Sequence, residues 1–344
     1  MMTRQKGTVL IVTLWTITLL TILVAVLASQ NRLSAQTAFY HQQDLGNWAK
    51  LTAALNQAEM ELMMERMDEP PRELEVSELQ QINENPRYRF NGQPLQLHYA
   101  QPEGVVVRIY DHAGKINLRE ISRPRMRALL EKQLGEGLDV RAKLDALMGA
   151  WGDWLDLNDM AGLEGADTDY YLSLDPPYRP RNGAVETVEE ILLIRGFDEV
   201  FANVDLDAAF TLYGENELVN LNLATVEAMQ LLPGLTDELI AEIVAWREEN
   251  EFRGNGDVAQ IVPAENMADL RSWLQNNKTS NYYTIFVYAE SGHENAEEGD
   301  TVTDNAVTGF AETIEIIGAT NRPRVYKINP YQHIPTRLQV VTPL

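Results

Sequence analysis

The feature that most constrains this chain is an uncharged apolar segment next to its N-terminus. Residues 1–7 form a short basic stretch with Arg4 and Lys6, and residues 8–31 then contain no charged side chain. A helix of this length would measure roughly 36 Å, which is enough to cross a hydrocarbon core of about 30 Å. Positive charges ahead of such a span favour a cytoplasmic N-terminus. The sequence therefore predicts a single-pass membrane protein with most of its residues on the other side of the membrane.

The helix is expected to continue well beyond the membrane. Residues 33–67 keep a helix-forming composition, and their large apolar residues recur at the spacing of one helix face. This apolar stripe consists of Trp48, Leu51, Leu55 and Leu62. Two consecutive prolines at residues 70–71 then prevent the helix from continuing.

Three kinds of N-terminal processing are compatible with a basic stretch followed by an apolar one. A secretory signal peptide would be cut between Ala28 and Ser29, but its apolar core usually spans only about 7–15 residues. An uncleaved anchor fits the longer run found here. The residues RQKG at positions 4–7, directly followed by TVLIV, resemble the cleavage site of type IV prepilin-like proteins. That resemblance implies cleavage between Gly7 and Thr8 by a prepilin peptidase, and methylation of the new Thr8 amine.

One position departs from the commonest pattern of these proteins. Counting from Thr8, the fifth mature residue is Val12, where most pilins carry a glutamate. A carboxylate in lipid is costly and persists when it is paired, and pilins are thought to pair it with a neighbouring subunit. Within the family, its absence resembles the K-type minor pseudopilin of type II secretion, the subunit at the filament tip.

Composition argues against nucleic-acid binding and against catalysis. The formal net charge is −23, which repels nucleic acid and anionic head groups and suits divalent cations. Cysteine is absent, which excludes disulfides and thiolate zinc sites, and the five histidines lie far apart without an HExxH pair. The sequence has neither a G-x-S-x-G elbow nor a glycine-rich phosphate loop. We therefore expect a protein that is not an enzyme and has no catalytic residues.

Beyond the long helix, strand and helix patterns follow one another in blocks. Strands are expected at residues 95–100, 105–110, 282–289, 311–317, 324–328 and 338–341. Helices are expected at residues 125–133, 140–155, 188–193, 224–232, 237–249 and 267–274. The simplest interpretation is an α+β fold in which a large all-α domain is inserted between the strands of a small antiparallel sheet. Its parts are a leader at 1–7, a long helix at 8–68 with its transmembrane portion at 8–31, a first α/β part at 69–118, the helical insert at 119–280 and C-terminal strands at 281–344.

The expected insert carries the most specific sequence motifs. They are WGDWLDLND at 151–159, GADTDYY at 165–171, DPPYR at 175–179 and TVEEILLIRGF at 187–197. This succession is very similar to the general secretion pathway protein K family, the minor pseudopilin of type II secretion, and the resemblance extends over essentially the whole chain.

The resemblance implies a pseudopilin fold and a structural role at the tip of the pseudopilus, in protein export from the periplasm across the outer membrane. It also implies an inner-membrane location with a periplasmic C-terminal domain, as in Gram-negative bacteria. I- and J-type minor pseudopilins would then be the partners that contact the stripe at Trp48, Leu51, Leu55 and Leu62. The alternative is a minor pilin of a related type IV filament, which would share the leader and the helix but would not need the insert.

Six carboxylates gather in a glycine-containing stretch of the insert. They are Asp153, Asp156, Asp159, Glu164, Asp167 and Asp169. Oxygen ligands on a flexible loop suit Ca²⁺ better than zinc or copper, although the spacing is not that of an EF-hand. A solvated acidic loop that caps the next helix is the alternative. The family resemblance implies calcium in the helical domain and favours the metal.

A second motif belongs to another functional class. The residues VNLNLAT at 219–225, LPGL at 232–235 and the following helix resemble a helix-hairpin-helix unit, and residues 116–118 are a weaker copy of its opening. Such hairpins often bind DNA phosphates through backbone N–H groups. Here Thr236 replaces the usual second glycine and the flanks are acidic, whereas phosphate binding relies on lysine and arginine. We expect a packing unit and no nucleic-acid partner.

Overall fold

The computed structural model describes residues 6–66, 89–98, 101–135, 137, 139–275, 278–289, 308–318 and 321–333. Contacts within the chain divide it into two compact units, Met1–Ala53 and Ala54–Leu344. The expected leader at residues 1–7 lies largely outside the described residues. The expected helix break at 68–71 and the last expected strand at 338–341 lie entirely outside them.

The first unit contains most of helix α1, which runs from Lys6 to Glu65. Within the described residues one helical span, Val9–Glu65, is long and apolar enough to cross a membrane, and the mean hydropathy of its most apolar stretch is 2.6. Its threonine hydroxyls are satisfied inside the helix, since Thr13 and Thr18 donate to the carbonyls of Leu10 and Leu14 at 2.9 and 3.0 Å. The helix fits a single-pass membrane anchor.

The second unit is built on a five-stranded antiparallel sheet in the order β1-β2-β5-β6-β7. The strands are β1 (Asn91–Leu95), β2 (Val105–Asp111), β5 (Tyr282–Ala289), β6 (Thr308–Glu315) and β7 (Arg324–His333). β-branched side chains on the central strands form its core, and Val107, Ile109 and Val287 are completely buried. Beyond the end of α1, Arg66 donates to the Tyr283 hydroxyl at 3.1 Å and thereby ties this end to β5.

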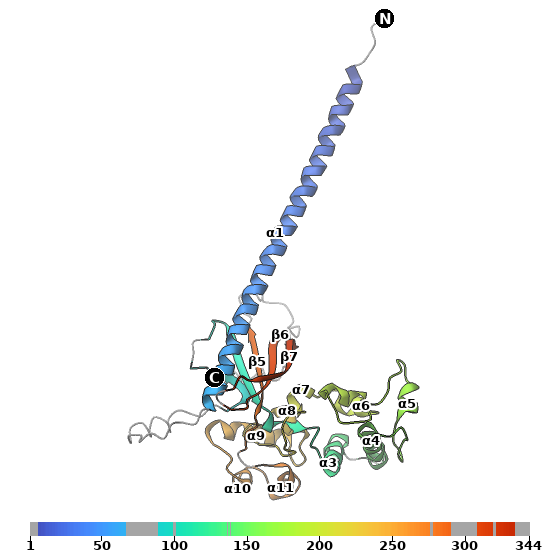
Figure 1. Cartoon of the computed structure of the whole chain (residues 1–344), viewed down its shortest axis with the longest axis vertical. Coiled ribbons are helices and arrows are strands. Elements are labelled where there is room, and N and C mark those ends of the chain that lie inside the picture. The colour runs from blue at the N-terminus through green and yellow to red at the C-terminus, as the bar shows by residue number, and fades with distance from the viewer. Residues whose placement is uncertain are drawn as a thin grey trace, which may run out of the picture. The chain divides into compact units, whose positions relative to one another are not determined.

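A long helical insert separates β2 from β5, although these two strands are neighbours in the sheet (Figure 1). Its main helices are α3 (Arg123–Leu134), α4 (Val140–Leu155), α5 (Thr168–Leu172), α6 (Phe197–Phe201), α7 (Leu206–Ala209), α8 (Val226–Leu231), α9 (Asp237–Glu249), α10 (Asn255–Val258) and α11 (Ala264–Leu270). Three 3₁₀ helices, η1 (His112–Gly114), η2 (Val188–Leu193) and η3 (Arg271–Trp273), complete them. Figure 1 shows α3–α6 in one group and α9–α11 in another.

The insert is not purely helical. Strands β3 (Ile116–Asn117) and β4 (Phe210–Thr211) form a short parallel pair inside it. A continuous core fills the insert, and its largest fully buried side chains include Trp154, Tyr171 and Trp273. The insert was predicted to be all-α, and this pair of short strands corrects that prediction.

Most of the expected elements are confirmed, several of them to the residue. Helices α4 and α9 and strand β5 have the predicted bounds, while the predicted helix at 188–193 is the 3₁₀ helix η2. The first strand was predicted wrongly: β1 ends at Leu95 where the prediction began. After Leu95 the backbone leaves the sheet, and the His98 amide donates to the Glu61 carboxylate on α1 at 3.3 Å. That contact explains why the strand does not continue through residues 96–98; residues 99 and 100 lie outside the described residues.

Candidate functional site

The processing site predicted between Gly7 and Thr8 lies in the first turns of α1. Residues 1–5 of the leader lie outside the described residues. The structure leaves cleavage and methylation as predictions.

The apolar stripe on α1 is divided between two roles. Leu55 and Leu62 are 5% and 0% exposed, since they pack inside the second unit together with Ala54 and Ala58. Their side chains are therefore covered by this chain itself. Trp48 is 56% exposed and Leu51 is half-buried, so partner contact for these two stays a prediction.

The acidic stretch is organised around Asp153, which is 5% exposed near the end of α4. The Gly162 amide donates to both oxygens of its carboxylate, at 3.1 and 3.0 Å. Gly165 also lies against it, and a Cβ at Gly165 would come within 1.9 Å of Asp153 Oδ2. Burial raises the pKa of Asp153, and the charges of Asp156 and Asp167 add to this effect. The loop thus approaches the Asp153 carboxylate closely at Gly162 and Gly165, where a larger residue would clash with it.

Asp167 is the second buried carboxylate, at 3% exposure. It caps α5, where its Oδ1 accepts from the Thr168 amide at 2.7 Å. Its Oδ2 is buried without a hydrogen-bond partner among the described residues, which is costly for a carboxylate. An added cation would satisfy this oxygen.

The other four carboxylates play smaller parts. Asp156 accepts from the Asn158 amide at 3.0 Å, and Asp159 accepts from Thr168 Oγ1 and Asn182 Nδ2 at 3.0 and 2.8 Å. Glu164 and Asp169 are exposed. Within the described residues, no three His, Cys, Asp or Glu side chains are arranged to hold a metal ion. Calcium at this loop stays a prediction, and Asp153 and Asp167 are the residues that fit it.

The helix-hairpin-helix motif forms α8, a five-residue connector and α9. The hairpin is packed inside the insert. Lys132 Nζ donates to the carbonyls of Leu232 and Leu235 at 2.7 and 2.8 Å, and Asn266 Nδ2 donates to that of Gly234 at 2.8 Å. Gly234 has φ +82°, and a Cβ there would lie 2.3 Å from the Asn266 carbonyl oxygen. In this structure the hairpin contributes to packing.

The weaker copy of this motif is a second module with the same construction. Asn117 and Asn220 each accept from the amide two residues ahead, at 3.0 Å, and each donates to a distant carbonyl at 3.0 Å. A helix begins six residues after each asparagine, and a five-residue connector leads to the next helix. Each module closes with a parallel pairing, β3 with β4 in the first and Val219 with Leu274 in the second. The insert therefore contains two related modules.

A cavity of about 300 Å³ was missed by the sequence analysis. Its lining comes from β2, η2, α7, β4 and the C-terminal strands, so its members are spread from residue 110 to residue 329. The charged residues at its wall include Lys115 and Lys327. A lysine within an otherwise uncharged stretch, at residues 113–118, was the available signal for a buried amine.

Comparisons with known proteins agree with this architecture. Residues 114–204 match the family model described as type II secretion system (T2SS), protein K. The fold is similar to a chain in the crystal structure of the GspK-GspI-GspJ complex from the enterotoxigenic Escherichia coli type 2 secretion system. The identity is 12% and the TM-score 0.50, over 87% of this chain and 99% of that chain. The fold of this chain is GspK-like. The matched protein K segment holds most of the first module, including the acidic stretch. No curated protein matches the sequence.

Proposed function

We propose that this chain is the K-type minor pseudopilin at the tip of a type II secretion pseudopilus. It would act as a structural subunit that supports protein export from the periplasm across the outer membrane, and not as an enzyme. The observation that carries this proposal is the position of the segment similar to protein K. It lies in the insert between β2 and β5, which are neighbouring strands of the sheet, in a chain that begins with a long apolar helix. An inner-membrane anchor with a cytoplasmic N-terminus and a periplasmic second unit follows from the same assignment.

The tip position is supported by the size of the insert. Pseudopilus subunits pack their N-terminal helices side by side, so each globular part must fit between its neighbours along the filament. An insert that runs from β2 to β5 enlarges this chain far beyond its sheet. A subunit stacked above would collide with it, whereas at the tip no subunit lies above. The apolar Val12, in place of a pairing glutamate, fits a subunit with fewer helix contacts.

The proposed partners are I- and J-type minor pseudopilins, the proteins with which the similar Escherichia coli chain was solved. The surface assigned to them is the part of the α1 stripe formed by Trp48, which is exposed, and Leu51, which is half-buried. Exposed aromatic and aliphatic side chains on a solvated helix are stabilised when a partner helix covers them.

Co-expression of the full chain with I- and J-type subunits, followed by purification in detergent, tests the proposal. We expect a discrete 1:1:1 complex by size and mass. The double substitution Trp48→Ser and Leu51→Ser should weaken it at least tenfold, because it removes the apolar contact. Phe39→Ser is the matched control, since Phe39 is 58% exposed but lies about half a turn around the helix from Trp48. Homopolymers, or decoration along whole filaments, would contradict the tip assignment.

Processing by a prepilin peptidase is part of the same proposal. N-terminal sequencing of the mature protein should begin at a methylated Thr8, and Gly7→Leu should leave full-length protein in the membrane. A mature N-terminus at Ser29 or Met1 would contradict it.

We also propose that the acidic stretch binds Ca²⁺ through Asp153 and Asp167, with Asp156 and Asp159 as neighbouring oxygen donors. The support is the buried, unpartnered Oδ2 of Asp167 beside a second buried carboxylate. A bound cation would neutralise these charges and fix the loop. Glu164 and Asp169 complete the six carboxylates named from the sequence.

A further inference from the structure

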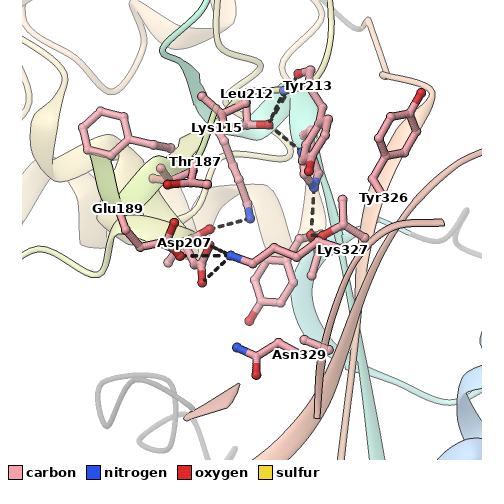
Figure 2. Close-up of a pocket in the computed structure, with 18 of the residues that line it drawn as sticks. Lys115, Thr187, Glu189, Asp207, Leu212, Tyr213, Tyr326, Lys327 and Asn329 are labelled. Atoms are coloured by element: carbon pink, nitrogen blue, oxygen red, sulfur yellow. Dashed lines mark hydrogen bonds and ion pairs between the residues drawn. The ribbon is translucent and has the colours of Figure 1, made fainter. Parts of the chain in front are cut away.

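The cavity lies where the insert meets the C-terminal strands of the sheet (Figure 2). Thr187 and Glu189 come from the η2 region and Asp207 from α7, while Tyr326, Lys327 and Asn329 come from β7. Its volume of about 300 Å³ is at the lower end of the range for small-molecule sites. The cavity is therefore large enough for a molecule of one ring and a few further atoms.

The cavity wall carries two lysines and four carboxylates, namely Lys115, Lys327, Glu186, Glu189, Asp205 and Asp207. Lys327 Nζ lies 3.0 Å from Asp207 Oδ1 and 3.1 Å from Glu189 Oε1. Lys115 Nζ approaches the same region from the other side and donates to the Asp207 carbonyl at 2.6 Å (Figure 2). Asp205 and Asp207 attract the Lys115 ammonium. Lys327 is therefore already paired, and the carboxylates of the wall outnumber its lysines, so an anionic ligand would be disfavoured.

Lys115 offers the polar contact for a ligand. It is 6% exposed, and an ammonium has three N–H donors, of which the hydrogen bond to Asp207 uses one. Burial lowers the pKa of Lys115, so an added acceptor would stabilise its charged form. A carbonyl oxygen within the cavity would supply that acceptor without adding charge.

The remaining walls are apolar and largely aromatic. Tyr110, Phe210, Tyr213 and Phe286 contribute rings, and Ala311 contributes a small side chain from β6. His112 is fixed at the wall, since its two ring nitrogens contact the hydroxyls of Thr211 and Thr284 at 2.7 and 2.8 Å. A wall whose polar groups are already satisfied suits an aromatic ring.

We propose that this cavity is a binding site for a small neutral aromatic molecule that carries a carbonyl acceptor. The ring lies among the aromatic side chains, and the carbonyl accepts from Lys115 Nζ. Bound there, the ligand connects η2 and α7 of the insert to β6 and β7 of the sheet. The proposal is independent of the pseudopilus assignment, because it rests on the cavity alone.

The test uses the full chain in detergent and the photoreactive probe 4-azidoacetanilide, whose adducts are located by mass spectrometry of peptides. We expect adducts on peptides that contain the cavity residues, and competition by unlabelled acetanilide. Sodium benzoate, which is charged, and toluene, which lacks the acceptor, should compete at least tenfold less well. Lys115→Met should weaken acetanilide competition about tenfold and leave toluene competition unchanged. Lys143→Met is its control, since Lys143 is outside the lining and pairs with Glu199.

Filling the cavity provides an independent check. Ala311→Leu should remove the adducts from the cavity peptides, and Ala208→Leu should do so from the opposite wall if the first variant unfolds. Equal labelling of the wild type and of a folded filled variant would overturn the proposal. Labelling confined to the apolar part of α1, or competition by benzoate equal to that by acetanilide, would overturn it as well.

Discussion

The two modules of the insert begin alike and then diverge. Each starts with a buried asparagine and continues through a helix, a five-residue connector and a second helix. In the second module, residues 250–273 return directly to the parallel bridge at Leu274. In the first, the return to β4 takes residues 156–209, which is more than twice as long and includes the acidic stretch.

The difference between the modules shows which segment can carry functional residues while the shared helices keep the core packed. The asparagine turn, the two helices and the closing pair occur in both modules in the same order, although α3 has 12 residues and α8 has 6. The path between the second helix and the closing pair differs most between the modules, and in the first module it carries most of the acidic stretch and part of the cavity wall. In the second module this segment is short, and the module contributes to the packing of the insert.

The largest loss of stability is expected from replacing a glycine in one of the five-residue connectors. Gly234 in the connector of the second module is enclosed by other residues, whereas Gly135 in that of the first module has open space around it. Gly234→Ala should destabilise the protein by about 3–5 kcal/mol, because it combines a positive φ with a backbone clash at Asn266. Gly135 has φ +66° but an open surrounding, so Gly135→Ala should cost only about 1–2 kcal/mol. Urea unfolding followed by tryptophan fluorescence measures both. Equal losses would contradict the view that only the second connector is enclosed.

The asparagine turns test whether the modules are equivalent. Asn117→Ala and Asn220→Ala each leave a backbone amide and a carbonyl without their side-chain partner, at a cost of about 2–3 kcal/mol. The two losses of stability in urea unfolding should agree within about 0.5 kcal/mol. The two 3.0 Å bonds and the burial match in both modules, and Asn117 adds only a longer bond of 3.4 Å to the Tyr213 carbonyl. A large loss of stability in only one of the two variants would show that the modules are not equivalent.

Calcium should stabilise the protein by binding to the first module only. At a free concentration of 100 times the dissociation constant, the expected gain is about 2.7 kcal/mol, seen as a higher melting temperature in calcium than in chelator. Asp153→Asn combined with Asp167→Asn should remove this difference. Glu242→Gln, an exposed carboxylate of α9 in the second module, should leave it unchanged. An identical melting temperature of the wild type in calcium and in chelator would refute the site.

A pH dependence is expected from Lys132, which lies in the last turn of the first helix of one module and donates to the hairpin carbonyls of the other. Burial lowers the pKa of its ammonium to about 8, whereas the unfolded value is 10.5. Between these two pH values the unfolded chain holds a proton that the folded chain has lost, so stability rises with pH. Relative to Lys132→Met, the wild type should gain stability from pH 8 to pH 10.5. A difference that stays constant over this range would show that the amine is solvated.

Local patterns were enough to predict most elements, because each depends on residues close in sequence. The periodicity of α4 and α9 and the aromatic and β-branched residues of β5 gave their bounds directly. The shift of β1 and the burial of Leu55 and Leu62 could not be predicted, since both depend on contacts between α1 and distant segments. Neither could the cavity, whose lysines lie 212 positions apart and meet only at Asp207.

The adjacency of β2 and β5 has a consequence for the order of folding. His112 and Thr284 are 172 positions apart in the chain, yet their side chains meet at 2.8 Å. Closing so long an unfolded loop is entropically costly, and each halving of its effective length lowers that cost by about 0.6 kcal/mol. An insert that folds first brings its own two ends together, because Asn220 bonds to both of them: its amide donates to the Ala113 carbonyl at 2.8 Å and its Nδ2 to the Lys278 carbonyl at 3.0 Å. We expect refolding kinetics in which the insert acquires protection from hydrogen exchange before the sheet closes, so that the inserted domain acts as the nucleus for the strands that flank it.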